Sequence, residues 1–125
     1  MKRRIKYLAF ILALVIALAG CYYDEVAVFE GLPKNASLKN DVQPILTQNC
    51  TATGCHDEAP AHDPSLVSGN TYDALKDGNY LNTAIPAESK LYLEIASGNM
   101  PPSGPLTSNE MKIILAWITE GAKNN

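Results

Sequence analysis

The chain has 125 residues and a formal net charge of −3, and 46% of its residues are hydrophobic, which predicts one small domain. Four of the ten basic residues lie within positions 2–6, so the rest of the chain carries six lysines, no arginine and all thirteen acidic residues, a formal charge of −7. Because binding to nucleic acid depends on basic contacts to phosphate, this acidic balance argues against nucleic acid as a partner.

Residues 1–20 have the pattern of an export signal. A basic start is followed by an uncharged, mostly aliphatic run of 13 residues, 7–19, which is shorter than the roughly 20 residues of a bilayer span. The signal is followed by Cys21, and the four residues Leu18-Ala19-Gly20-Cys21 resemble a bacterial lipobox. That resemblance implies cleavage before Cys21 and lipid attachment to this residue, whereas an ordinary signal peptide with a chance cysteine is the alternative. We therefore expect a lipid-anchored protein of the cell envelope, at a periplasmic or outer-membrane face, held at the membrane by a tether over residues 21–37.

Helical signals dominate the predicted domain, residues 38–125. Asn40 can cap a helix over 41–49, and a short helix over 72–77 would be closed by Gly78. A third helix is expected over 86–97, with a proline at its first position and a glycine after its end.

The last helix has the strongest signal, because Thr107-Ser108-Asn109-Glu110 forms a capping box ahead of apolar residues at helical spacing. Residues 57–70 and 98–105 are rich in proline, glycine and polar residues and predict loops. No alternating pattern indicates a strand, so we expect a small all-α fold of three to five helices with long loops.

Two thiols and an imidazole lie within seven residues, in Cys50-Thr51-Ala52-Thr53-Gly54-Cys55-His56. In an exported protein the two cysteines could close a small disulfide loop. They could also bind zinc together with His56 and His62, although neighbouring side chains such as Cys55 and His56 diverge and structural zinc sites mostly use separated pairs.

Covalent haem attachment accounts for more of the sequence. Thioethers from Cys50 and Cys55 would tie the porphyrin to the backbone, and His56 would then be the proximal iron ligand. Met100 stands in a proline-stiffened loop 44 residues after His56 and is suited to be the distal ligand, with His62 as its rival. A thioether ligand favours Fe(II) and raises the reduction potential.

These features together resemble a small monohaem domain of the class I cytochrome c type, as carried by some bacterial lipoproteins. The parallels span residues of about 38–123: a helix before the motif, Cys-His, a helix, a Met-Pro-Pro loop and a C-terminal amphipathic helix with an aromatic residue. The family motif is Cys-X-X-Cys-His, whereas the gap here has four residues; if one thioether alone forms, we expect it at Cys55.

The resemblance implies a cytochrome c-like fold wrapped around one haem c, with iron ligated by His56 and Met100. It implies an electron carrier that serves redox partner proteins of the cell envelope, not an enzyme, because both axial positions are filled. The alternatives are an exported zinc-binding or disulfide-stapled domain without haem, a haem sensor or enzyme with a labile methionine, and an accessory module of a larger assembly.

Overall fold

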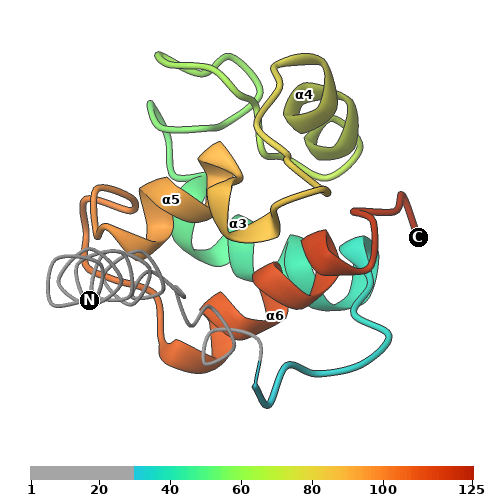
Figure 1. The fold of residues 1–125 in the computed structure, drawn as a ribbon. Helices are drawn as coiled ribbons and strands as arrows, with labels where there is room; N and C mark the ends of the chain where they lie inside the picture. Colours follow the sequence, from blue (N-terminus) through green and yellow to red (C-terminus); the bar gives the residue numbers. More distant parts are fainter. Residues whose placement is uncertain (1–29) are drawn as a thin grey trace, which may run out of the picture. The chain divides into compact units, whose positions relative to one another are not determined.

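Four α-helices joined by long loops make up most of the regular structure in the computed structural model, which describes residues 30–125 (Figure 1). The helices are α3 (Gln43–Cys50), α4 (Thr71–Asp77), α5 (Lys90–Ala96) and α6 (Ser108–Thr119). A π-helical turn, η1 (Leu38–Val42), leads into α3, and a 3-10 turn, η2 (Pro86–Glu88), precedes α5. No strand occurs in this range, which confirms the all-α prediction. The predicted signal and Cys21 lie outside the described residues.

The compact unit of residues 31–125 begins ahead of position 38, where the sequence suggested a domain start. Ala36 is buried, and Leu32 packs against the core. The backbone N–H of Asn35 also donates a hydrogen bond to the side chain of Glu120, at 2.7 Å. The last part of the predicted tether is therefore bound to the folded domain.

The first helical segment, η1 continued by α3, starts one turn earlier than the helix expected over 41–49 and has a different N-cap residue. Ser37, not Asn40, is the N-cap: its backbone is extended and its hydroxyl accepts the N–H of Asn40 at 3.1 Å. The cause is burial, because Leu38 continues the apolar face of the helix into the core. The N–H groups of Leu38 and Lys39 are satisfied by Asn125, whose side-chain and main-chain oxygens accept them at 3.1 and 2.8 Å.

The expected helix over 86–97 is interrupted at Ser89. This residue has an extended backbone, with ψ of 130°, and it is fully buried. Its hydroxyl accepts the N–H of Asn82 at 2.8 Å and donates to the carbonyl of Asn82 at 3.3 Å. A buried hydroxyl must find such partners, and the bonds to the preceding loop hold the chain out of helical geometry at this point.

The other helix ends follow the sequence signals. Helix α4 ends at Gly78 as expected, where a Cβ atom would clash with the Tyr80 ring and the Ala74 carbonyl, which favours glycine. The capping box of α6 is present, since Thr107 accepts the Glu110 N–H and Glu110 accepts the Thr107 N–H. Gly121 follows α6 with a φ of 98°, a value that glycine adopts without strain.

Helix α6 lies at the centre of the packing and contacts η1, α5 and η2. Its Ile114, Leu115, Trp117 and Ile118 are almost completely buried, and burial of each such side chain is worth roughly 1.5–3 kcal/mol. The Trp117 indole N–H donates to the carbonyl of Lys123 at 2.9 Å. Met111 is partly buried against this core.

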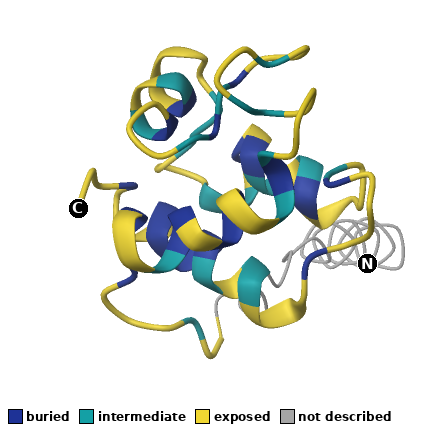
Figure 2. Cartoon of the chain, turned by 180° about the vertical axis from the view of Figure 1, so that it is seen from behind, coloured by how far each residue is buried: buried dark blue, intermediate teal, exposed yellow. Residues whose placement is uncertain are grey.

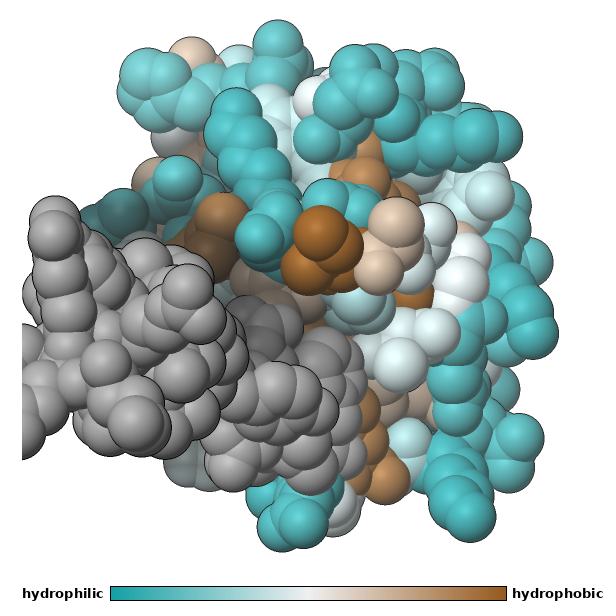
Figure 3. Space-filling model, viewed as in Figure 1, coloured by the Kyte–Doolittle hydropathy of each residue, from teal (hydrophilic) through white to brown (hydrophobic). Residues whose placement is uncertain are grey.

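Buried residues gather where the helices face one another, whereas the outer helix surfaces are exposed (Figure 2). The face seen in Figure 3 is largely hydrophilic where it is coloured, with small apolar areas. No helix within residues 30–125 has the length and apolar character needed to cross a membrane.

Replacing Thr107 with alanine should destabilise the fold by about 1 kcal/mol at neutral pH, because it removes the N-cap of α6. The hydrogen bonds from Thr107 also lower the pKa of Glu110 below its ordinary value of 4.5. Because the pKa of this carboxyl group is lower in the folded state, Glu110 contributes to the free energy of unfolding above pH 4.5. That contribution is lost as the pH falls through the folded-state pKa. Denaturation at neutral pH and well below pH 4.5 should therefore show the T107A defect shrinking in acid.

Thr119→Ala is the matched control, because Thr119 lies at the other end of α6, where its hydroxyl donates to the Leu115 carbonyl. A T107A defect of equal size at both pH values would contradict the proposed coupling between Thr107 and Glu110.

Candidate functional site

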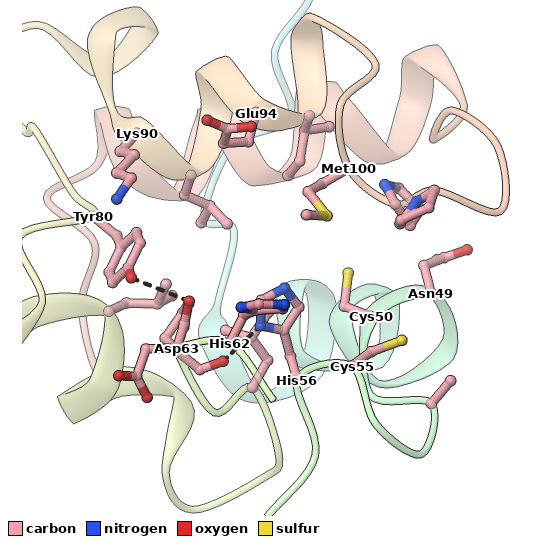
Figure 4. Close-up of a pocket in the computed structure, with 18 of the residues that line it drawn as sticks. Asn49, Cys50, Cys55, His56, His62, Asp63, Tyr80, Lys90, Glu94 and Met100 are labelled. Atoms are coloured by element: carbon pink, nitrogen blue, oxygen red, sulfur yellow. Dashed lines mark hydrogen bonds between the residues drawn. The ribbon is translucent and has the colours of Figure 1, made fainter. Parts of the chain in front are cut away.

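A cavity of about 760 Å³ lies between the end of α3 with its following loop and the α5 helix with the loop after it, and Figure 4 shows its lining. This volume is in the range of pockets that hold cofactors and other small molecules. Cys50, Cys55, His56 and Met100, the predicted site residues, all line this one cavity, and so does His62. Residues half the domain apart in sequence are thus brought to a common space.

The segment between the two cysteines is a closed turn that accommodates the four-residue gap. The N–H of Cys55 donates to the carbonyl of Ala52 at 2.8 Å, and the N–H of His56 donates to the carbonyl of Cys50 at 3.1 Å. Gly54 has a φ of 80°, which lets the chain reverse. The turn folds the gap back on itself, so that both cysteines still line the cavity.

His56 is fixed by its ring as well as by its backbone. Its Nδ1 lies 2.8 Å from the carbonyl oxygen of Pro64. A carbonyl oxygen can only accept a hydrogen bond, so Nδ1 carries the proton and Nε2 of the neutral ring keeps a free lone pair. In proteins, an imidazole that binds a metal is usually oriented by such a bond from its other nitrogen. The arrangement around His56 is therefore suited to metal ligation through Nε2.

Met100 reaches the cavity because α5 ends in a tight reversal. Gly98, the expected residue after the helix, has a φ of 76°, and the N–H of Met100 then donates back to the carbonyl of Glu94 at 3.0 Å. Pro101 after it is buried. The Met100 sulfur points into the cavity from the side opposite His56 (Figure 4).

The two thiols differ in environment. Cys50, the last residue of α3, is 8% exposed, whereas Cys55 is exposed. Burial, the nearby Cys55 thiol and the Glu110 carboxylate raise the pKa of Cys50 from 9.0 to about 11. Cys50 is therefore held as a protonated thiol at neutral pH.

The lining of the cavity is partly apolar and partly charged. Four buried side chains form the apolar part: Leu66, Leu75, Leu91 and Ile95. Lys90, Glu94, Asp63 and Tyr80 line the cavity as well, at the end away from the cysteines (Figure 4). A largely apolar pocket with a few polar groups at defined positions is the usual form of a cofactor site.

Neither alternative use of the cysteines is preformed in the described part of the chain. Cys50 and Cys55 are not joined by a disulfide. Within residues 30–125 no group of three or more histidine, cysteine, aspartate or glutamate side chains is arranged to hold a metal ion. His62 is exposed and lies on the same side of the cavity as His56 (Figure 4), not opposite to it.

Three residues of the site carry no motif in the sequence: Pro64, Tyr80 and Lys90. Pro64 contributes a main-chain carbonyl, which any residue could supply, so no side-chain pattern marks it. Tyr80 and Lys90 belong to the site because they line the cavity, and Lys90 becomes the first residue of α5 only through the break at Ser89.

Comparison with known proteins gave no match: no protein family matches the chain, and neither does any curated protein or solved structure.

The thiol environments predict a difference in alkylation for protein prepared without covalent attachment. At pH values below 9.0, the ordinary thiol pKa, Cys55 should react with iodoacetamide well before Cys50, and the Cys50 rate should rise until the pH reaches about 11. Because the pKa of Cys50 is higher in the folded state, its contribution to the free energy of unfolding is present below the ordinary thiol pKa. That contribution is lost as the pH climbs through the folded-state value. Mass spectrometry of the labelled peptides measures both rates. Unfolding in urea is the control and should make the two rates similar; equal rates in the folded protein would contradict the assigned environments.

Proposed function

We propose that this protein transfers single electrons through one covalently bound c-type haem, ligated by His56 and Met100, in a cytochrome c-like domain. The observation that carries the proposal is that Cys50, Cys55, His56 and Met100 line the same cavity of about 760 Å³. Two thiols, a neutral imidazole and a thioether are the set of groups that covalent haem attachment and His/Met ligation require.

The thiols supply the covalent link. Each would add across one vinyl double bond of the porphyrin, with its sulfur bonding to one carbon and its hydrogen moving to the other, so that no oxidant or reductant is consumed. The closed turn over residues 50–56 supports attachment at both cysteines despite the four-residue gap.

The two axial ligands define the redox chemistry. The Pro64 carbonyl fixes the tautomer of His56 and leaves Nε2 as the donor, while Met100 approaches from the opposite side. The bound haem would supply a one-electron couple between Fe(II) and Fe(III), whose potential a methionine ligand raises. If His56 and Met100 both bind the iron, no position would remain there for a substrate, and the protein is proposed to be an electron carrier, not an enzyme.

The surroundings of the haem would control solvent access. Leu66, Leu75, Leu91 and Ile95 form an apolar lining, and a low local polarity is one of the means by which proteins tune a haem potential. The acidic surface is suited to redox partners with basic docking faces. Lipid attachment at Cys21, which lies outside the described residues, would confine the carrier to a membrane of the cell envelope.

Haem staining after denaturing electrophoresis and a pyridine haemochrome spectrum test the central claim. Protein expressed with a cytochrome c maturation system should keep one haem per chain, and its band position should correspond to two saturated vinyl groups. Cys50→Ala and Cys55→Ala should each shift the band toward one free vinyl group. Loss of all haem on denaturation of the wild-type protein, or stoichiometric zinc in place of iron, would contradict the proposal.

Met100→Ala tests the distal ligand. The variant should lose the charge-transfer band of methionine-ligated iron, should bind added imidazole at the vacated position and should have a lower midpoint potential, because a thioether favours Fe(II). Met111→Ala is the control, since Met111 packs against the core from α6 and does not line the cavity. An unchanged M100A spectrum would remove Met100 from the proposed site.

A further inference from the structure

We propose that Lys90 and Tyr80 form a carboxylate-binding subsite that takes one propionate group of the haem and so sets the direction in which the porphyrin enters the cavity. This inference rests on the proposed function. It concerns the charged end of the cavity, which the covalent link and the axial ligands leave without a role.

Two contacts hold Lys90 beside Tyr80, one made by its own side chain and one by the backbone of its neighbour Leu91. The Lys90 ammonium lies 4.6 Å from the centre of the Tyr80 ring, and the N–H of Leu91 donates to the carbonyl of Tyr80 at 3.1 Å. The first contact places a positive charge beside the tyrosine, and the second holds the start of α5 against the segment after α4. Both side chains line the cavity.

The charge distribution makes Lys90 the natural partner of an anion. Lys90 is the only lysine or arginine among the described residues that line the cavity. Asp63 and Glu94 line the same end and would repel a carboxylate, although Asn99 donates to Glu94 at 3.2 Å and Glu94 is thereby engaged with the loop after α5. An anion can enter this end only where a cation offsets the two carboxylates, and Lys90 is that cation.

The present contacts of the pair are weak enough to be exchanged. The Tyr80 hydroxyl donates to the main-chain carbonyl of Asp63 at 3.2 Å, which is long for a bond from a hydroxyl. A cation–π contact is likewise weaker than a charge-assisted hydrogen bond to a carboxylate. An incoming propionate would therefore accept hydrogen bonds from both the ammonium and the hydroxyl.

The position of this subsite fits the shape of the cofactor. The vinyl and propionate groups stand on opposite edges of the porphyrin, and Lys90 with Tyr80 lies at the opposite end of the cavity from Cys50 and Cys55 (Figure 4). With the vinyl edge bonded to the cysteines, the propionate edge would point toward Lys90, and the aliphatic side chains of the lining would contact the flat ring.

The test uses the haem-loaded full chain carrying Lys90→Gln, Lys90→Arg or Tyr80→Phe. Lys76→Gln is the matched control: it removes the same charge from a lysine that also stands over a tyrosine, Tyr72, at 5.7 Å, but that lies outside the cavity lining. The readouts are the propionate bending band in resonance Raman spectra, which reports hydrogen bonding to the carboxylate, and the midpoint potential at fixed pH.

We expect K90Q to shift the propionate band and to lower the ratio of reduced to oxidised protein at a fixed potential by about threefold to tenfold, because a positive charge near the haem stabilises the added electron. K90R should keep the wild-type potential, since arginine pairs with carboxylates, and Y80F should shift the band without any change of charge. K76Q should match the wild type in both readouts.

An unchanged propionate band in both K90Q and Y80F, with haem still attached, would overturn the subsite and leave the electron-transfer proposal standing. A wild-type protein that retains no covalent haem would overturn both. A band shift of the same size in K76Q would show a general charge effect and would also reject the specific role of Lys90.

Discussion

The candidate site depends on three hydrogen bonds made by a single residue, His56. Its N–H donates to the Cys50 carbonyl at 3.1 Å, its carbonyl accepts the Leu66 N–H at 2.9 Å, and its ring nitrogen donates to the Pro64 carbonyl at 2.8 Å. Such bonds contribute only about 0.5–1.5 kcal/mol each. They matter because residues 51–70 contain no helix or strand. Pro64 and Leu66 are the only buried residues of this loop, and the hydrogen bonds of His56 join them to the end of α3.

The opposite wall of the cavity is built independently and is placed by α6. Helix α6 packs against η1, ahead of α3, and against α5, ahead of Met100. The side chain of Asn49 at the end of α3 also donates to Glu110 in the first turn of α6, at 3.3 Å. The distance between the cysteine side and the methionine side of the cavity is therefore set by one helix, whose residues around Trp117 are almost completely buried. A site made of loops gains defined geometry in this way from a helical scaffold.

The cavity combines three kinds of groups: the two cysteines at one end, the pair Lys90 and Tyr80 at the other end, and a set of buried aliphatic side chains in its lining. A simple apolar ligand would leave the polar groups at both ends without partners, and a small hydrophilic ligand would leave the aliphatic lining without contacts. A flat, largely apolar macrocycle with reactive groups on one edge and carboxylates on the other uses all three kinds of groups. This match between the cavity and the chemistry of haem is the physical basis of the proposed function, beyond the residue types themselves.

Local signals in the sequence determined the parts of this protein that depend on a few neighbouring residues. The capping box at Thr107, the ends of α4 and α5 at their glycines and the proline-rich loops all follow from such short-range preferences, and the types and spacing of Cys50, Cys55, His56 and Met100 defined a candidate site.

Tertiary packing alone decided the start of the first helix at Ser37 and the break at Ser89, because each depends on what the residue is buried against. It also decided that Pro64 orients His56 and that Lys90 faces the cysteines across the cavity. A main-chain carbonyl has no sequence signature, and the direction of a surface lysine is set by the neighbours that the fold brings to it.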